Sequence, residues 1–380
     1  MKVLVISEYY PSEAKPFSGR YIKQQMDEFR NLGHMVDVLI PVRKSAAPLQ
    51  LVELPDNRYY TLGYKTDRYE LMPLQAAKSF AMALDALCEE NGYDVIAVHL
   101  TSDTILSNVK KVAKKRKILF VQHYHGLNVW EEYVQSHPFR QKLYAARRAN
   151  ILKSAAAVIG VSEKVSDNIR QKLPGEKVFT VYNGVDTNLF RFSQKEKKET
   201  LKIVGVGRLI RTKGYHVLVE AVRRMRAEYP NISVEIVGDG PEQDNLNKLI
   251  QEANLEDVIT LAGRKDYAGV AASLAEADIF VLPSYYEALG CVYLEAMGCG
   301  LPAIGVKGMG IDEIIEDGIN GYNLIPESVE DLMAKLERFI ALPTEERQKM
   351  AKNAYDTALE FTWANSAKTL EKVYKEILAK

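Results

Sequence analysis

Short apolar runs rich in β-branched residues recur along the chain and alternate with amphipathic stretches of helical period. In the first half these runs are Lys2–Ser7, Met35–Pro41, Val95–Leu100, Ile118–His123 and Ala157–Val161. Runs of this length are typical of strands buried on both faces of a parallel sheet. Their alternation with helical stretches predicts a doubly wound α/β domain.

The same alternation begins again in the second half of the chain. Its apolar runs are Leu201–Val206, Val234–Val237, Val258–Ala262, Ile279–Leu282 and Pro302–Gly305. The segment between the two sets, Ser193–Thr200, is highly charged and has no apolar period, so we interpret it as an interdomain linker. The pattern therefore predicts two Rossmann-like domains, over residues 1–190 and 200–360.

The C-terminal stretch, about residues 361–380, has its apolar positions mainly at spacings of three and four, which predicts an amphipathic helix. This helix either closes its own domain or crosses to the first one. Ligands of open α/β sheets bind beyond the carboxyl ends of the strands, so we expect the chemistry in the loops that border a cleft between the two sheets.

Composition excludes some classes of protein. The 50 Lys and Arg residues balance 50 Asp and Glu residues, which argues against a dedicated nucleic-acid binder. The balance is uneven along the chain, because residues 1–185 hold 26 basic and 19 acidic residues and the remainder is acidic by the same margin. The three cysteines, Cys88, Cys291 and Cys299, indicate no disulfide framework.

The first residues lack the features of a signal peptide, and no run of about 18 apolar residues occurs. We therefore expect a cytoplasmic protein. The segments Lys110–Lys117 and Arg140–Arg148 are strongly basic, the second with Arg140, Leu143, Tyr144 and Arg147 at helical spacing. Such segments can lie on anionic lipid, so a peripheral contact with the inner membrane face is a further expectation, against the alternative of ordinary solvated helix faces.

The segment Pro283–Gly305 carries the most informative chemistry. A strand ends at its start, and a helix is predicted from about Gly290 to Met297. The free amides of Ala288, Leu289 and Gly290 then point at an incoming anion, which predicts a phosphate site. Glu287 and Glu295 are spaced too widely for the carboxylate pair of a glycosidase and suit two ends of an elongated ligand.

Two cations follow another predicted strand end in Val206–Gly214. The strand ends at Gly207, and Arg208 and Lys213 come after it in a loop that lacks the P-loop pattern. Two cations suit a diphosphate leaving group. Because no Asp-x-Asp motif occurs, we expect no carboxylate-held metal ion and no other cofactor.

The first half offers two weaker candidates. Gly19 could open the helix that follows it and let backbone amides approach a phosphate. His125 follows a strand at the ligand-binding edge, two residues after His123, and is the better placed to contact a sugar hydroxyl or a developing charge.

In this order the motifs are similar to those of the retaining glycosyltransferases of family 4, and the resemblance covers nearly the whole chain. Its parts are SGR, HGLNV, VSE, VYNGVDTNLF, VGRLIRTKG, VGDGPE, EAMGCGLP, DEIIEDGINGYNL and FTWANSA. The resemblance implies the GT-B architecture, in which two Rossmann-like domains with doubly wound parallel sheets face each other and a C-terminal helix crosses between them.

The resemblance also implies roles for residues at matching positions. Arg208 and Lys213 would hold the diphosphate, Glu287 the donor sugar and Glu295 the nucleotide ribose. Donor contacts would also come from Gly207 and from the backbone of Ala288, Leu289, Gly290 and Val292, with Gly19 lining the phosphate and His125 reaching the sugar. The sequence departs at Leu289 and Asn128, where Phe and Asp are common, and both changes touch the sugar pocket.

The resemblance thus implies metal-independent transfer, with retention, from a UDP- or GDP-sugar to an acceptor hydroxyl. The acceptor would be a sugar or a lipid-linked glycan in cell-envelope polysaccharide or glycolipid synthesis. Two alternatives share the architecture: a sugar-nucleotide epimerase, which needs acid and base groups at the sugar ring, and a non-catalytic nucleotide-sugar-binding protein. An NAD(P)-dependent oxidoreductase is disfavoured because no Gly-x-Gly-x-x-Gly follows the first strand.

Overall fold

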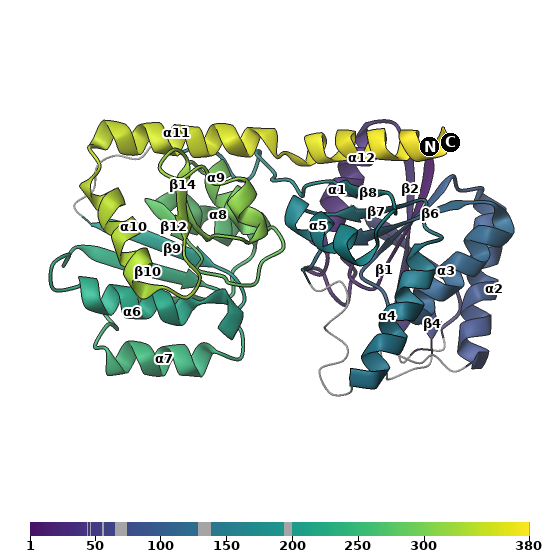
Figure 1. The fold of residues 1–380 in the computed structure, drawn as a ribbon, viewed down its shortest axis with the longest axis horizontal. Helices are drawn as coiled ribbons and strands as arrows, with labels where there is room; N and C mark the ends of the chain where they lie inside the picture. The colour runs from purple at the N-terminus through teal and green to yellow at the C-terminus, as the bar shows by residue number, and fades with distance from the viewer. Residues whose placement is uncertain are drawn as a thin grey trace. The chain divides into compact units, whose positions relative to one another are not determined.

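The chain forms two compact units in a computed structural model, shown in Figure 1, that describes residues 1–43, 45, 47–54, 57–64, 74–127, 138–193 and 200–379. Unit 1 comprises Met1–Tyr182 together with Trp363–Lys380, and unit 2 comprises Asn183–Thr362. Each unit has its own sheet with helices on both faces. The predicted α/β class is confirmed.

Unit 1 is built on an eight-stranded sheet with the order β3-β4-β2-β1-β5-β6-β7-β8. Its strands pair in parallel except for β3 and β4, which are antiparallel. The strands are β1 (Lys2–Ser7), β2 (Met35–Arg43), β3 (Gln50–Leu54), β4 (Asn57–Tyr64), β5 (Val95–His99), β6 (Leu119–Tyr124), β7 (Ala157–Gly160) and β8 (Val178–Thr180).

The helices of unit 1 cover both faces of this sheet. They are α1 (Arg20–Asn31), α2 (Leu74–Asn91), α3 (Asp103–Arg116), α4 (Pro138–Leu152), α5 (Glu163–Lys172) and α12 (Trp363–Leu378). Successive residues of β1 are buried on opposite faces, as the alternation of side chains along a strand requires. Val3 and Val5 belong to the core cluster that α1 and α12 cover.

Unit 2 has a six-stranded parallel sheet with the order β11-β10-β9-β12-β13-β14. The strands are β9 (Leu201–Val206), β10 (Ile232–Val237), β11 (Ile259–Gly263), β12 (Ile279–Val281), β13 (Ala303–Val306) and β14 (Gly321–Leu324). The helices are η1 (Arg211–Lys213), α6 (Tyr215–Met225), α7 (Gln243–Glu252), α8 (Tyr267–Glu276), α9 (Cys291–Gly298), η2 (Gly310–Glu313), α10 (Val329–Ala341) and α11 (Thr344–Glu360).

The boundary between the units differs from the one expected from sequence. The chain enters unit 2 at Asn183, ahead of the predicted domain end at residue 190. The reason is local packing, because the Val185 amide donates to Phe361 O and the Phe190 ring contacts Tyr267, all within unit 2. The predicted linker, Ser193–Thr200, therefore follows residues that already belong to unit 2, and residues 194–199 lie outside the described part of the chain.

Of the two expected positions for the C-terminal helix, α12 has the second: it leaves unit 2 and packs on unit 1. Its apolar stripe, formed by Ala367, Leu370, Val373, Tyr374 and Ile377, is part of the core of unit 1. It lies beside α1 in Figure 1, and Gln25 of α1 donates to Ser366 Oγ at 2.8 Å in a buried position. Unit 1 is thus completed by residues from the far end of the chain.

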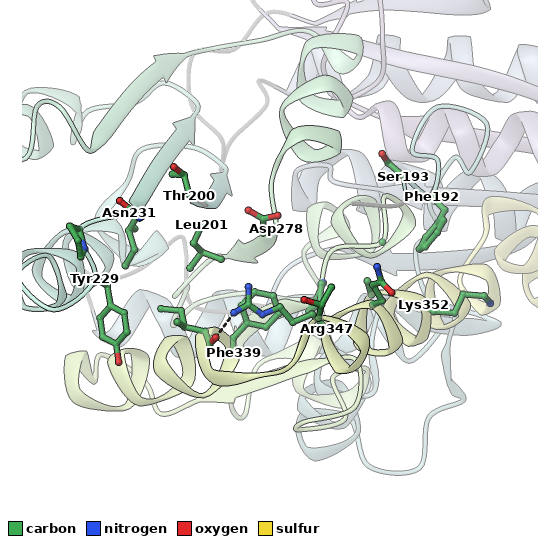
Figure 2. Close-up of a pocket in the computed structure, with 18 of the residues that line it drawn as sticks. Phe192, Ser193, Thr200, Leu201, Tyr229, Asn231, Asp278, Phe339, Arg347 and Lys352 are labelled. Atoms are coloured by element: carbon green, nitrogen blue, oxygen red, sulfur yellow. Dashed lines mark hydrogen bonds between the residues drawn. The ribbon is translucent and has the colours of Figure 1, made fainter. Parts of the chain in front are cut away.

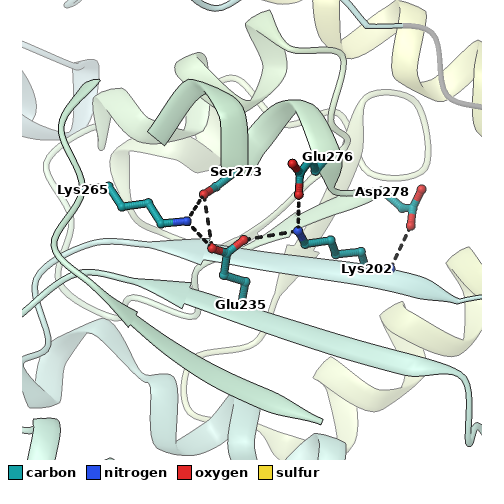
Figure 3. Close-up of polar contacts among 6 residues, drawn as sticks. All are labelled: Lys202, Glu235, Lys265, Ser273, Glu276 and Asp278. Atoms are coloured by element: carbon teal, nitrogen blue, oxygen red, sulfur yellow. Dashed lines mark hydrogen bonds and ion pairs between the residues drawn. The ribbon is translucent and has the colours of Figure 1, made fainter. Parts of the chain in front are cut away.

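A polar network joins β9, β10 and α8 of unit 2, as Figure 3 shows. The carboxylate of Glu235, only 15% exposed, pairs with Lys265 and lies 3.4 Å from Lys202 Nζ. Lys202 also pairs with Glu276 at 2.8 Å, and Lys265 donates to Ser273 Oγ at 2.7 Å. Burial on its own raises the pKa of Glu235, but the two lysines outweigh it and hold that pKa below its ordinary value.

We expect Glu235→Gln to destabilise unit 2 at pH 7 by about 1.5–3 kcal/mol, the usual worth of hydrogen bonds to a charged group. A carboxyl whose pKa is lowered by folding stabilises the native state above its unfolded pKa, and that stabilisation is lost as the pH falls through the folded pKa. The melting temperatures of wild type and variant should therefore differ by several degrees at pH 7 and converge as the pH falls through the lowered pKa of Glu235.

The surface partner provides the control for this measurement. Glu276 is 66% exposed, so Glu276→Gln should change the melting temperature little at either pH. A difference in melting temperature between wild type and Glu235→Gln that stays constant down to the pH at which Glu235 is protonated in the folded protein would show that the charge of Glu235 is not what stabilises the fold.

Candidate active site

The sheet of unit 2 reverses its direction of growth between β9 and β12, which are neighbours in the sheet although β10 and β11 come between them in sequence. In open α/β sheets the ligand site lies beyond the carboxyl ends of the strands at such a switch point. The two loops that flank it follow Val206 and Val281. They contain the cations and the glutamate singled out from the sequence.

The loop after β9 carries Arg208 and ends in the short helix η1, whose last residue is Lys213. It is tied to the loop after β12, because Thr212 O accepts both Tyr285 N at 3.1 Å and Ser284 Oγ at 3.2 Å. Gly207 N donates to Val237 O at 2.9 Å and so anchors the start of the loop on the neighbouring strand. These bonds bring residues about seventy positions apart in sequence into one site.

The ammonium group of Lys213 forms an ion pair with the carboxylate of Glu287. The two side chains are 17% and 14% exposed, so the pair is shielded from bulk water on most sides. Sequence reasoning placed Lys213 at the diphosphate and Glu287 at the sugar without expecting them to touch. Since a lysine has three N–H donors, Lys213 can keep this carboxylate and still donate to a ligand oxygen.

A cavity of about 390 Å³ gathers most of the predicted site residues of unit 2. Arg208 is exposed at its wall and has no ion-pair partner among the described residues. The predicted residues lining the cavity are Gly207, Arg208, Lys213, Glu287, Gly290, Val292 and Glu295. The cavity wall therefore combines two cations with two carboxylates, one of which, Glu287, pairs with Lys213.

Helix α9 begins at Cys291, and Gly290 is its N-cap in the left-handed conformation. The amides that lack an acceptor within the helix are consequently those of Gly290, Cys291 and Val292. The anion-binding amides expected at residues 288–290 are thus shifted toward the C-terminus. Ala288 and Leu289 precede the helix, have buried side chains and do not line the cavity.

Gly310, the first residue of η2, packs directly against the backbone of the loop before α9. The Gly310 amide donates to Glu287 O at 3.2 Å. A Cβ atom at Gly310 would lie 1.7 Å from Ala288 O, which no packed structure tolerates. The backbone of residues 287–289 can therefore hold this position only because residue 310 is a glycine.

Four residues of the cavity wall were not among the sequence candidates: Val206, Tyr267, Val270 and Cys291. Tyr267 is the first residue of α8, after β11, so it could have been found by inspecting every loop at the carboxyl edge of the sheet. Cys291 accepts a hydrogen bond from Asn183 Nδ2 at 3.3 Å, and burial raises the pKa of its thiol to about 12. It is therefore a packed thiol and not a reactive one.

Unit 2 also has a larger cavity, of about 590 Å³, shown in Figure 2. It lies at the opposite edge of the sheet, against Leu201 and Ile232, which begin β9 and β10. Asp278, just before β12, and Arg347, whose guanidinium donates to Ile340 O, also border it. Because ligands of open α/β sheets bind beyond the carboxyl ends of the strands, the smaller cavity is the better candidate for a phosphate ligand.

The two remaining candidates, Gly19 and His125, belong to unit 1. Gly19 is the N-cap of α1, with φ of 62°. A Cβ atom there would lie 2.1 Å from Tyr9 O, so both its conformation and its surroundings require glycine. The prediction that a helix opens at this glycine is confirmed, and its proposed contact with phosphate stays a prediction.

His125 lies beside two other histidines at the carboxyl edge of β5 and β6. His99 Nδ1 is 2.9 Å from His125 Nε2, and the rings of His99 and His123 stack with centroids 4.0 Å apart. His123 Nε2 in turn lies 3.0 Å from the hydroxyl of Tyr374 on α12. Burial lowers the pKa of His125 to about 3, so its imidazole is neutral near pH 7.

The basic stretches of unit 1 are partly neutralised by neighbouring groups. Lys115 and Arg116 pair with Asp85 on α2, and Arg148 pairs with Asp103. The side chains of Arg140, Leu143 and Tyr144 lie outside the described part of the chain, as does Asn128. The expected contact with anionic lipid stays a prediction.

Two further kinds of feature are absent from the residues that the structure describes. No helix among them is both long and apolar enough to cross a membrane. Within the same residues, no group of three or more His, Cys, Asp or Glu side chains is arranged to hold a metal ion.

Sequence families match both halves of the chain. Residues 18–189 match the family described as Glycosyltransferase Family 4, and residues 186–357 match Glycosyl transferases group 1. Among curated relatives, the putative colanic acid biosynthesis glycosyltransferase WcaL of Salmonella typhimurium is 30% identical over 65% of this chain. The chain spans less than two thirds of the length of the first relatives it matches, 63% in the case of WcaL.

Solved structures share the fold over the full length of the chain. Sucrose-phosphate synthase from Thermosynechococcus elongatus has a TM-score of 0.79 at 21% identity, covering 100% of this chain and 99% of that one. The Anabaena protein HepE in complex with UDP and glucose has a TM-score of 0.74 at 20% identity, covering 99% and 100%. The predicted two-domain GT-B architecture is therefore confirmed.

Proposed function

We propose that this chain, which belongs to the group 1 glycosyltransferases of family 4, transfers a sugar from a nucleoside-diphosphate sugar to an acceptor hydroxyl. One observation carries the proposal: the cavity at the carboxyl edge of unit 2 combines Arg208, Lys213 and the start of α9 with two spaced glutamates. The other cavity described for unit 2 lies at the amino ends of the strands, away from the switch point where open α/β sheets bind their ligands.

The cations and the helix amides suit the diphosphate of the donor. Arg208 offers a planar fork of donors to phosphate oxygens, and the amides of Cys291 and Val292 add the positive end of the helix dipole. As the bond between sugar and diphosphate breaks, negative charge grows on the leaving phosphate. Groups already fixed around it stabilise that charge without reorganisation, which is how most electrostatic catalysis works.

The glutamates suit the two ends of the donor. Glu295, on α9, would accept hydrogen bonds from the ribose diol, and Glu287, held by Lys213, would contact the sugar. We further propose that transfer retains the anomeric configuration and needs no metal ion. His125 would contact the sugar as a neutral imidazole, so we infer that it acts by hydrogen bonding and not as a cation.

The donor is proposed to be a UDP- or GDP-sugar. HepE was solved in complex with UDP and glucose, and the WcaL name refers to colanic acid biosynthesis. By analogy we propose an acceptor in cell-envelope polysaccharide or glycolipid synthesis, reached from the cytoplasmic side. Co-sedimentation with anionic vesicles would test the predicted membrane contact.

A panel of nucleotide sugars tests the proposal directly. A donor present at a hundred times its dissociation constant should stabilise the protein by about 2.7 kcal/mol in a thermal-shift measurement. The best donor is then incubated with candidate acceptors, and the anomeric configuration of the product is read by NMR. Failure of every nucleotide sugar to bind would refute the proposal, and conversion of a donor to its isomer without an acceptor would favour the epimerase alternative.

Substitution of the two glutamates should affect different kinetic constants. Glu295→Gln should raise the KM for the donor and the Kd for the nucleoside diphosphate by about tenfold, with little change in kcat, because a ribose contact is similar in the ground and transition states. Glu287→Gln should instead lower kcat by about a hundredfold, since it loosens Lys213 and the sugar contact together.

The surface variant Glu252→Gln on α7 provides the control and should behave as wild type. Equal changes for Glu287→Gln and Glu295→Gln in nucleoside-diphosphate affinity, with kcat unaltered, would show that Glu287 is not at the sugar.

A further inference from the structure

Two buried histidines share one hydrogen bond at the carboxyl edge of the unit 1 sheet. His99 is the last residue of β5, and His125 directly follows β6. The Nδ1 atom of His99 lies 2.9 Å from Nε2 of His125. Burial lowers the pKa of both imidazoles, so each is neutral near pH 7 and carries a single N–H. Either ring could therefore be the donor in this hydrogen bond.

The ring of His99 is fixed by its packing. The register of β5 and β6 pairs His99 with His123, and their rings stack with centroids 4.0 Å apart and planes inclined by 17°. His99 is fully buried, at 0% exposure. Because protein cores are close-packed, the ring cannot turn its Nδ1 away from His125 without displacing these neighbours. The contact between His99 and His125 is thus built into the fold of unit 1.

Each of the two rings has one further nitrogen, and these two atoms differ in their surroundings. His99 Nε2 and His125 Nδ1 are both buried and have no hydrogen-bond partner in the described part of the chain. His125 lines a cavity of about 730 Å³, so a ligand in that cavity can reach its ring. His99 does not line this cavity. Of the two residues, only His125 can therefore gain a partner for its second nitrogen when a ligand binds.

The direction of the hydrogen bond decides where the second N–H lies. If His125 donated to His99, the remaining proton of the pair would lie on Nε2 of His99, inside the core and without an acceptor. If His99 donates through Nδ1, the remaining proton lies on Nδ1 of His125, at the cavity. A buried N–H without an acceptor carries the full penalty of its lost hydration. A ligand oxygen removes that penalty only in the second arrangement.

We propose that His99 is a positioning residue, which donates to Nε2 of His125 and thereby holds the proton of His125 on Nδ1. His125 then presents an N–H group to an oxygen of the ligand. Both of its nitrogens are engaged, so it has no free lone pair with which to act as a general base. Only the identification of that oxygen as one of the transferred sugar rests on the proposed function. The position of the proton does not depend on it.

The proton positions can be measured directly by long-range ¹H–¹⁵N correlation NMR at pH 7 on the full chain, labelled with ¹⁵N only at histidine. A protonated ring nitrogen and a bare one have well-separated ¹⁵N shifts, and His125→Phe identifies the signals of His125 by their loss. We expect the proton of His125 on Nδ1 and that of His99 also on Nδ1. A proton on Nε2 of His125 would overturn the proposal.

Two substitutions of His99 test its effect on transfer. His99→Asn keeps an amide N–H that can donate to His125, so its kcat/KM should stay within about threefold of wild type. His99→Leu removes the N–H and should lower kcat/KM about tenfold, the effect of one hydrogen bond. His216→Leu makes the same chemical change on α6 of unit 2 and should behave as wild type.

Melting temperatures measured alongside separate lost positioning from lost folding. Equal losses of transfer in His99→Asn and His99→Leu, or no loss in a folded His99→Leu, would overturn the proposal. If His99→Leu does not fold, the NMR measurement on the wild-type protein decides the question without it. The expected proton positions, without transfer from any nucleotide sugar, would support the role of His99 while refuting the proposed transferase activity.

Discussion

Arg208→Ala and Lys213→Ala should each lower kcat/KM for sugar transfer by two to three orders of magnitude, roughly the cost of removing one preorganised donor from a developing negative charge. Both side chains line the cavity at the switch point of unit 2. Arg208 has no ion-pair partner among the described residues, so its full charge is available to the leaving diphosphate. Lys213 acts twice, because it also positions Glu287.

Arg211→Ala is the matched control for these variants. Arg211 is exposed, lies in the same loop and does not line the cavity, so its removal should leave transfer within about twofold of wild type. Steady-state kinetics with the best donor, with melting temperatures measured alongside, separate lost catalysis from lost folding. Full activity in Arg208→Ala or Lys213→Ala would show that these cations do not carry the leaving-group charge. Loss of all transfer activity when a chelator removes Mg²⁺ would show the same.

Gly310→Ala should lower transfer by about a hundredfold although residue 310 does not line the cavity. Its new Cβ would collide with Ala288 O, so the loop that carries Glu287 must move by more than an ångström. Displacements of that size in a positioning loop cost about two orders of magnitude in rate. The collision should also destabilise unit 2 by about 1–3 kcal/mol, as overpacking does.

Gly308→Ala distinguishes collision from backbone strain. Gly308 has φ of 79° but nothing within 4 Å of its absent side chain, so alanine there strains the backbone without pushing the loop. It should lower the melting temperature modestly, by the equivalent of about 1 kcal/mol, and leave kcat close to wild type. If both variants lost transfer equally, backbone strain in this segment would explain the effect better than displacement of Glu287.

The parallel strands at the centre of both sheets were predictable because they are buried on both faces. Burial makes β1, β5 and β9 nearly continuous apolar runs that cannot be confused with loops. The edge strands β3, β8 and β14 were missed, as was β4, which lies between β3 and β2. The residues of β3 are exposed or half-buried, and its sequence has no long apolar run. The compact units divide at Asn183, a few residues ahead of the predicted boundary, because the packing that binds Val185 to unit 2 has no signature in composition.

The candidate site was predictable as far as each residue could be placed at a strand end. Glu287, Arg208 and Lys213 all follow strands of the same sheet, and they do share one cavity. The ion pair between Lys213 and Glu287 was not predictable, because it depends on how two loops 74 residues apart are tied together. The contact between His99 and His125 was not predictable for a similar reason. It depends on the register of β5 and β6, which places His99 beside His123.

The return of α12 to unit 1 sets the order in which the protein can mature on the ribosome. The apolar faces of Ile22, Met26 and Phe29 on α1 are covered by residues of α12, which are made only after the whole of unit 2. Unit 2 is one continuous segment, so it can fold before α12 has been synthesised and unit 1 is complete. At bacterial or eukaryotic synthesis rates the wait from Tyr182 to Leu378 is roughly 10–40 s. During that interval the apolar face of α1 that α12 will cover is exposed on the nascent N-terminal domain. We therefore expect a chaperone to bind this domain rather than unit 2.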